Sequence, residues 1–185
     1  KCNICLNYRM AKLYFHYSSM NAGKSTALLQ ANHNYFERGM KALLFTAKLD
    51  NREGLGFISS RIGIKKKAHA FSEDDNLFDF VQKKQGTGRL DCILVDEAQF
   101  LNQAQVRQLT KIVDTAGIPV LTYGIRTDFK GDVFEGSKFL MAWADEIKEI
   151  KTVCHCGKKA IMNARVSAAG DMETEGAQIE IGGNE

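Results

Sequence analysis

Short apolar runs alternate along this chain with longer segments that have helical character. The apolar and aromatic runs cover residues 13–17, 42–46, 92–95 and 119–123, and polar or glycine-containing stretches follow them. Continuous apolar runs of this length, without strict alternation, are typical of strands that are covered on both faces of a parallel sheet. They therefore predict the strands of a buried parallel sheet.

Segments between these runs are predicted to be helices, because they are rich in helix formers and each is followed by a glycine. The predicted helices are residues 24–38, 74–85 and 102–116. Asn102 can cap the last of these, whose apolar residues recur on one face. Residues 50–63 are polar with several glycines and predict a mobile loop. Strands alternating with helices indicate an α/β fold with right-handed crossovers.

The pattern changes after about residue 150, where short strands, two cysteines and a glycine-containing tail are expected. A length of 185 residues suits one domain with a small appendage. We predict an N-terminal extension over residues 1–9, a main domain over residues 10–150 and a small second lobe over residues 151–185. Met10 resembles a natural protein start.

Composition narrows the class of protein. The chain is 44% hydrophobic and 25% charged, and its net charge of +3 is too small to indicate a nucleic-acid-binding protein. The basic run Lys65–Lys67 is interpreted as a solvated loop face. No apolar stretch reaches the roughly 20 residues of a membrane helix, and no secretory signal pattern is present. The five cysteines, an odd number, favour reduced thiols or metal ligands. We expect a cytoplasmic protein that binds neither nucleic acid nor membranes.

The segment between the first predicted strand and helix has the spacing of a Walker A phosphate loop, with Ser18 in place of the first glycine. Gly23 lets the backbone approach phosphate oxygens, and the N–H groups at the helix start face the anion. Lys24 supplies charge to the β- and γ-phosphates, and the Ser25 hydroxyl can ligate Mg²⁺. The alternative is an ordinary helix start with a solvated lysine. The predicted phosphate-binding residues are Ser18, Ser19, Met20, Asn21, Ala22, Gly23, Lys24 and Ser25.

Two acids, Asp96 and Glu97, follow the apolar run at residues 92–95. This is the Walker B arrangement, in which acids at the carboxyl end of a strand face the ligand crevice. Asp96 can hold Mg²⁺ through water, and Glu97 can take a proton from a nucleophile. A polar strand exit is the simpler alternative for this pair alone. Together the two motifs predict a P-loop nucleotidase or kinase and leave open whether water or a hydroxyl is the acceptor.

The residues around these motifs resemble those of type II thymidine kinases, most closely the bacterial members, and the resemblance extends from Met10 to Glu185. The matching stretches are 17–26 (YSSMNAGKST), 50–52 (DNR), 96–100 (DEAQF), 123–129 (YGIRTDF) and 181–185 (IGGNE). The resemblance implies a RecA-like P-loop domain with a parallel sheet, a small zinc-ribbon-like lobe with a lasso loop, and a homotetramer. It also implies transfer of the ATP γ-phosphate to the 5′-hydroxyl of thymidine, with deoxyuridine as a second acceptor and dTTP as feedback inhibitor. The product dTMP would serve nucleotide salvage and DNA precursor synthesis.

The resemblance also implies roles for individual residues. Glu97 becomes the base on the 5′-hydroxyl, Arg52 a phosphate-side charge, and Asp96 and Gln99 part of the ATP site. The nucleoside-binding residues are Met20, Phe100 and Phe129 as pocket walls and Gln178, Ile179, Glu180, Ile181 and Gly182 as part of the lasso. Without the resemblance, Phe100 and Phe129 are more simply core residues and Arg52 a solvated side chain. Phe134 lies near the same region.

Cys154 and Cys156 match the first pair of zinc ligands in the family, here as Cys-x-Cys rather than the commoner Cys-x-x-Cys. In the family a second pair follows, at positions a few residues beyond Glu185. Cys2 and Cys5 could instead complete a Cys₄ site, although incidental thiols in a leader are the simpler interpretation. The predicted cofactors are Mg²⁺, which enters with ATP, and a structural Zn²⁺.

Two other classes of function remain as alternatives. A RecA-like ATPase acting on DNA would share both motifs, but the small net charge is against it. A zinc-knuckle binding module with a degenerate nucleotide site is disfavoured because both motifs are intact.

Overall fold

The computed structural model describes residues 11–50, 54–167 and 170–179, and its centre is a six-stranded sheet. The strand order is β5-β2-β6-β7-β1-β8, and every neighbouring pair is parallel. The strands are β1 (Leu13–Tyr17), β2 (Ala42–Ala47), β5 (His69–Phe71), β6 (Cys92–Val95), β7 (Val120–Gly124) and β8 (Glu146–Glu149). The predicted parallel α/β class is confirmed.

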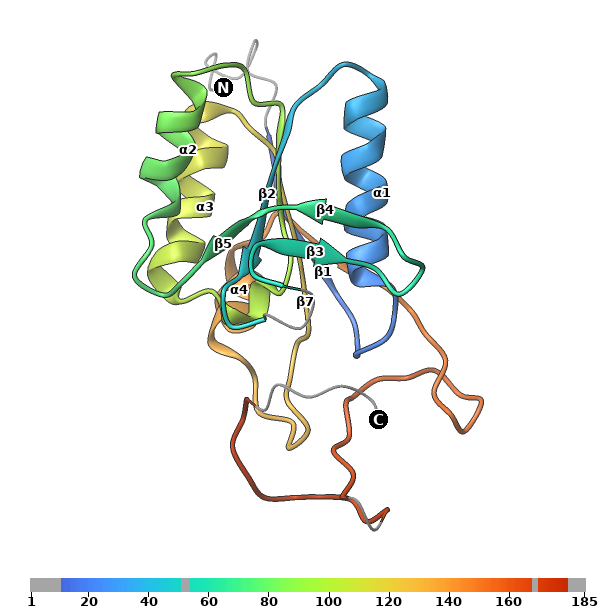
Figure 1. Cartoon of the computed structure of the whole chain (residues 1–185). Helices are drawn as coiled ribbons and strands as arrows, with labels where there is room; N and C mark the ends of the chain where they lie inside the picture. Colours follow the sequence, from blue (N-terminus) through green and yellow to red (C-terminus); the bar gives the residue numbers. More distant parts are fainter. Residues whose placement is uncertain (1–10, 51–53, 168–169, 180–185) are drawn as a thin grey trace, which may run out of the picture.

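Helices cover both faces of this sheet (Figure 1). They are α1 (Lys24–Glu37), α2 (Leu77–Gln85), α3 (Gln103–Ala116) and α4 (Glu135–Trp143). Alternate residues of each strand point to opposite faces, so Val95 packs with α2, α3 and α4, whereas Leu94 packs with α1. Helix α1 lies alone on its face in Figure 1, and the other helices lie on the opposite face. Both faces of the strands are buried, which explains why the strands read as continuous apolar runs.

Side-chain caps set the starts of two helices. Asn102 and Gln105 form a reciprocal capping box at the start of α3, as the sequence predicted for Asn102. Helix α2 begins at Leu77 rather than at residue 74, because Asn76 accepts the N–H of Asp79 at 3.0 Å. The residues before Asn76 form a turn in which the Asp75 carboxylate accepts the Ser72 N–H at 2.7 Å.

Some elements were not among those predicted. The expected loop at residues 50–63 contains β3 (Phe57–Ser59), which pairs antiparallel with β4 (Lys65–Lys67) to form a hairpin. The three lysines of β4 are exposed, as predicted, but they belong to a strand. Helix α4 and strands β5 and β8 are further additions. The edge strand β8 has no fully buried residue, and thus lacks the apolar run of the central strands.

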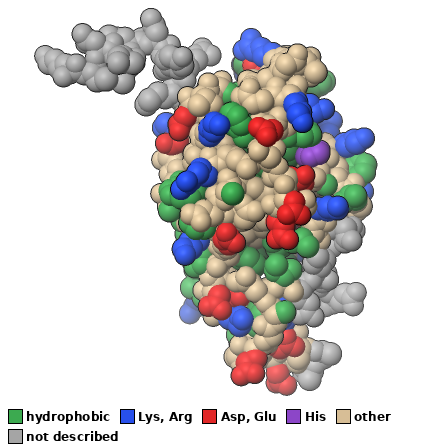
Figure 2. Space-filling model, turned by 90° about the vertical axis from the view of Figure 1, so that its left-hand side faces the viewer, with side chains coloured by type: hydrophobic (Ala, Val, Ile, Leu, Met, Phe, Trp, Pro, Cys, Tyr) green, Lys and Arg blue, Asp and Glu red, His purple; other side chains and the backbone are tan. Residues whose placement is uncertain are grey.

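The chain after Ile150 continues at the carboxyl end of the sheet (Figure 1). Its described residues form isolated bridges, Val153 with Lys159 and Val166 with Met172, rather than the short strands that were expected. The zinc ribbon and the lasso therefore remain predictions, as does the division at residue 150. Within the described ranges, no helix has both the length and the apolar character needed to cross a membrane. On the side of α2 and α3, acidic and basic side chains are interspersed (Figure 2).

Candidate active site

The phosphate loop connects β1 to α1 and is tied to the end of β7. The Ser18 N–H donates to the carbonyl of Gly124 at 3.3 Å, and the Lys24 ammonium donates to the carbonyl of Ser19 at 2.8 Å. Gly23 precedes α1 with φ 81° and ψ 23°, a left-handed conformation that favours glycine. The first turn of α1 carries no acidic residue. The N-terminal end of α1 therefore presents backbone N–H groups and a lysine, as an anion site requires.

The two sequence motifs meet at Asp96. This carboxylate is buried, and burial is the main cause of its raised pKa. The charge of the neighbouring Glu97 raises the pKa of Asp96 further. A hydrogen bond with Ser25 and the charge of Lys24 act in the opposite direction. The phosphate loop and Asp96 thus come together, as the sequence predicted from the position of the acids at the carboxyl end of a strand.

Strand order explains this meeting. Strand β7 lies between β1, which leads into the phosphate loop, and β6, which leads into the acidic pair. Because all three strands are parallel, their carboxyl ends share one edge of the sheet. The ligand crevice of an open α/β sheet lies at this edge.

Glu97 has an unusual backbone conformation for a residue other than glycine. Its φ of 51° and ψ of 41° are left-handed, and Asn21 of the phosphate loop has φ 65°. They are the non-glycine residues with positive φ in the described part of the chain. Such a conformation costs roughly 1–2 kcal/mol and commonly marks functional positions. It turns the chain sharply from β6 into the 3₁₀ helix η1 (Ala98–Phe100).

The Glu97 carboxylate is hydrogen-bonded to Gln99. The Gln99 amide donates from Nε2 to Glu97 Oε2 at 2.5 Å and accepts the Ile125 N–H on Oε1 at 3.2 Å. Sequence reasoning placed Gln99 among the ATP-binding residues and did not foresee this link. A glutamine two residues after a candidate base was the available signal.

The oxygen ligands at this site suit magnesium. The Ser25 hydroxyl and the Asp96 carboxylate are hard oxygen donors, which Mg²⁺ prefers, and they lie beside the lysine expected to contact the phosphates. Mg²⁺ would enter with the triphosphate as part of the substrate, and these two residues would hold it.

The predicted pocket walls lie in three places. Phe100 packs edge-to-face with Phe134, with ring centroids 6.0 Å apart. The Arg165 guanidinium lies 3.9 Å over the Phe129 ring. Met20 is 40% exposed on the phosphate loop. Phe100 is half-buried against the larger core, so its role as a core residue and its role as a wall are compatible.

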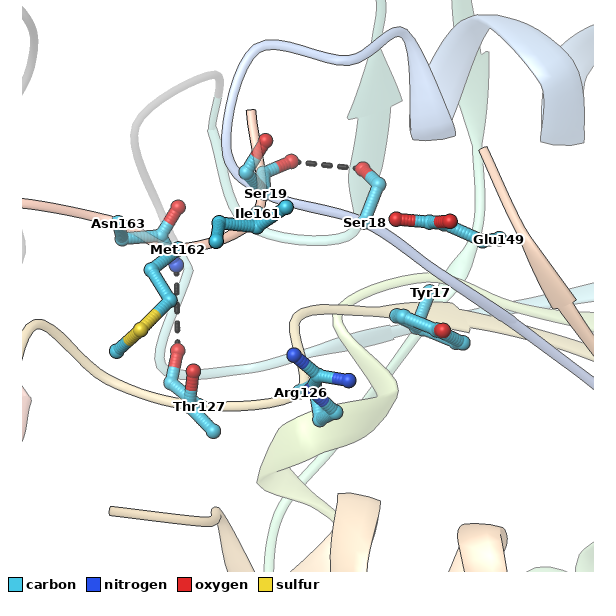
Figure 3. Close-up of a pocket in the computed structure, with 9 residues that line it drawn as sticks. All are labelled: Tyr17, Ser18, Ser19, Arg126, Thr127, Glu149, Ile161, Met162 and Asn163. Carbon is cyan, nitrogen blue, oxygen red and sulfur yellow. Dashed lines mark hydrogen bonds between the residues drawn. The ribbon is translucent and has the colours of Figure 1, made fainter. Parts of the chain in front are cut away.

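Asn163 joins the chain after Ile150 to the phosphate loop, a contact that sequence reasoning missed. Its Oδ1 accepts the Met20 N–H at 2.7 Å, and its Nδ2 donates to the Thr127 carbonyl at 3.2 Å. Figure 3 shows Asn163 beside Thr127, lining a small pocket next to Ser18 and Ser19. No sequence motif marked Asn163, because a single asparagine has no characteristic spacing.

Several other predicted site residues lie outside the described part of the chain or at its end. Arg52, Glu180, Ile181 and Gly182 lie outside the described residues, as do Cys2 and Cys5. Gln178 and Ile179 belong to the end of the described chain, where Ile179 is 43% exposed.

Cys154 and Cys156 lie in a turn closed by the Gly157 N–H, which donates to the Cys154 carbonyl at 2.8 Å. The pKa of the Cys154 thiol is lowered, first by a hydrogen bond from the backbone of Cys156 and then by one from its side chain. Within residues 11–50, 54–167 and 170–179, no group of three or more metal-ligating side chains is assembled. These two thiols therefore fit half of a tetrahedral zinc site, and the described residues do not complete it.

A parallel sheet with a Gly-Lys-Ser loop after one strand, and an acidic pair with a buried Asp96 after another, is consistent with the P-loop class of nucleotide-binding proteins. The sequence pattern of the thymidine kinase family matches residues 11–185, and this chain belongs to that family.

Comparison with individual relatives supports the same family. The thymidine kinase of Legionella pneumophila subsp. pneumophila is 58% identical over 177 residues, which cover 95% of this chain and 85% of the relative. A Xanthomonas oryzae pv. oryzae thymidine kinase is 57% identical with the same coverage. That of Mannheimia succiniciproducens is 54% identical over 176 residues, covering 95% and 90% of the two chains.

Proposed function

We propose that this protein is an ATP-dependent thymidine kinase that transfers the γ-phosphoryl group of Mg-ATP to the 5′-hydroxyl of thymidine. Membership of the thymidine kinase family over residues 11–185 carries this conclusion. The convergence of Lys24, Ser25 and Asp96 beside Glu97 supports it, because these groups are the ones that phosphoryl transfer requires. The product is dTMP, and deoxyuridine is a second acceptor to test.

Catalysis rests mainly on position and charge. The phosphate loop, residues 18–25, surrounds the phosphates with N–H groups, and Lys24 offsets charge on the transferred group. Ser25 and Asp96 hold the magnesium ion of the substrate. Glu97 accepts the proton of the 5′-hydroxyl as the hydroxyl oxygen attacks the γ-phosphorus, and the bond from the γ-phosphorus to the β–γ bridging oxygen breaks to release ADP.

On the nucleoside side, Met20, Phe100 and Phe129 supply apolar walls for the thymine ring. Residues 178–182 close over the base and exclude water, which would otherwise be a competing acceptor. Arg52 adds positive charge on the phosphate side. The ring contact between Phe129 and Arg165 supports this arrangement, since it brings the chain after Ile150 to the predicted pocket.

The family resemblance extends the proposal to assembly and regulation. We propose a cytoplasmic homotetramer that is inhibited by dTTP and holds a structural zinc ion through Cys154 and Cys156. Metal analysis of the purified protein tests the zinc site: Cys154→Ser should lose bound zinc, and Cys92→Ser, which changes a buried strand cysteine, should keep it. Equal zinc content in the two variants would exclude Cys154 as a ligand.

The decisive assay follows labelled γ-phosphate from Mg-ATP to a panel of nucleosides, with and without added Zn²⁺. Labelled dTMP is the expected product. Hydrolysis of ATP that DNA stimulates, with no nucleoside product, would instead favour the RecA-like ATPase. Bound ATP should raise the melting temperature of the protein, because a ligand of the native state stabilises it. No such rise would contradict the nucleotide site itself.

A further inference from the structure

The Gln99 side chain links the candidate base to the neighbouring strand. Its Nε2 donates to Glu97 Oε2 at 2.5 Å, and its Oε1 accepts the Ile125 N–H at 3.2 Å. Both ends of one amide are therefore engaged within the protein. An amide held at both ends fixes the position of each partner relative to the other.

Close packing holds Gln99 in place. Gln99 is 3% exposed, and β7 and α4 both pack against η1. A Cβ atom added to Gly124 would lie 2.7 Å from Gln99 Oε1, and one added to Gly136 would lie 2.5 Å from the Ala98 carbonyl oxygen. Glycine at both positions is what lets these segments surround the short helix η1.

The backbone of Ile125 is itself held from α4. The Ser137 hydroxyl donates to the Ile125 carbonyl at 2.6 Å, and Ser137 is fully buried. Hydrogen bonds thus hold Ile125 on both sides of its Cα, with Ser137 on the carbonyl and Gln99, the partner of the Glu97 carboxylate, on the N–H. The Ser137 and Gln99 side chains carry no charge and are shielded from solvent.

We infer that Gln99 is a positioning residue for Glu97, supported by Ile125 and Ser137. The left-handed backbone at Glu97 turns the chain sharply out of β6, and the Gln99 amide fixes where the Glu97 carboxylate lies after that turn. Gln99 therefore acts on the hydroxyl-activating step through Glu97. This differs from the sequence-based prediction that Gln99 contacts the ATP phosphates.

The inference rests on the proposed kinase function, and matched variants test it. Gln99→Met keeps the length of the side chain and removes both hydrogen bonds. Gln99→Glu keeps the acceptor for the Ile125 N–H and removes the donor to Glu97. The control is Gln105→Met, since Gln105 is 1% exposed and its amide nitrogen donates to the carbonyls of Ser72 and Asp75. kcat, KM for Mg-ATP and melting temperature are measured for each variant.

For Gln99→Met we expect kcat to fall about tenfold. KM for Mg-ATP should change by less than about twofold. Gln99→Glu should lower kcat at least as much, because it replaces the hydrogen-bond donor by a second carboxylate beside Glu97. The Gln105→Met variant should lose melting temperature without a comparable loss of kcat.

Two results would overturn the inference. A raised KM for Mg-ATP with kcat unchanged would make Gln99 a phosphate contact. A kinetic profile of Gln99→Met indistinguishable from that of Gln105→Met would give Gln99 a purely structural role. If the Met variant does not fold, Gln99→Glu and Ser137→Ala decide by the same criterion. A wild-type protein that phosphorylates another nucleoside but not thymidine would refute only the choice of acceptor, and the profiles are then measured with the accepted nucleoside.

Discussion

The sheet domain and the chain after Ile150 differ in how they are held together. Phe15, Phe45 and Val95 of the sheet are completely buried. By contrast, Val153 and Met172 after Ile150 are 72% and 71% exposed. The second region has isolated bridges where the first has a continuous parallel sheet. Its apolar side chains thus form no core of their own among the described residues.

This difference falls between the two halves of the proposed active site. Lys24 and Ser25 begin α1, and Asp96 and Glu97 directly follow the buried strand β6, so the proposed phosphate-handling half is organised before substrate arrives. The proposed nucleoside half relies on single contacts from the second region, such as Asn163 to the phosphate loop and Arg165 to Phe129. We expect changes in the first region to affect kcat or folding, and changes in the second to affect KM.

Replacing the candidate base should have the largest effect. Glu97→Gln keeps the shape of the side chain but cannot accept the hydroxyl proton, so we expect kcat to fall by about 10²–10⁴. Binding of Mg-ATP and thymidine, measured by calorimetry, should be retained. A kcat near that of the wild type would show that another group is the base.

Packing of the two regions can be compared at a pair of glycines. Gly136→Ala would bring Cβ within 2.9 Å of the carbonyl oxygens of Ala98, Gln99 and Leu101. We expect a loss of about 3 kcal/mol and a melting temperature lower by roughly 6–12 °C. Gly157→Ala meets no atom within 4 Å and is strained only by its φ of 81°, which should cost about 1 kcal/mol. Equal losses in a thermal melt would contradict the difference in packing.

The buried Asp96 carboxylate should lower the stability of the folded protein when no metal is bound. Because the pKa of Asp96 is raised above its ordinary 3.8, its ionised form destabilises the folded protein. Its contribution is therefore favourable at low pH and is lost as pH rises. In metal-free buffer at about pH 8, Asp96→Asn should melt roughly 3–6 °C higher than the wild type.

The gain in melting temperature from Asp96→Asn should shrink as pH falls toward the ordinary pKa of an aspartate. Saturating Mg-ATP should reverse the order, since the wild type alone keeps the metal ligand. A variant less stable than the wild type in metal-free buffer at every pH would refute this account of Asp96.

The smallest effect is expected at the contact between the regions. Asn163→Ala removes the acceptor of the Met20 N–H, which should cost about 1 kcal/mol, or about fivefold in kcat/KM. The matched control is Asn34→Ala, whose side chain bonds Gln30 on the exposed face of α1. Steady-state kinetics that show no difference between these variants would mean that Asn163 does not support the loop.

Features that depend on local sequence were predictable. The buried strands β1 and β6 have the predicted bounds, and α3 begins at its predicted cap. The meeting of the phosphate loop with Asp96 followed from the rule that parallel strands end at one edge. The roles of Met20, Phe100 and Phe129 came from the family resemblance and stay predictions.

What could not be predicted depends on long-range packing. Helix α4 starts at a residue without a side-chain cap, so no local signal marked it. Strand β8 is formed by its pairing with β1 at the sheet edge, and its alternating charges carry no apolar pattern. The link from Gln99 to Ile125 spans 26 positions in the chain. Only the approach of β7 to η1 brings these two residues together.

Strand β7 also fixes the distance between the two strands on either side of it. Because it is inserted between β1 and β6, the ends of those two strands are two strand spacings apart, about 9–10 Å, and the side chains of Ser25 and Asp96 meet across this distance. Main-chain hydrogen bonds set this spacing between the strands, so side-chain substitutions leave it unchanged. An enzyme with a different acceptor could keep the same spacing between these strands. The residues that select the acceptor would then differ in the turn after β7 and in the chain beyond β8.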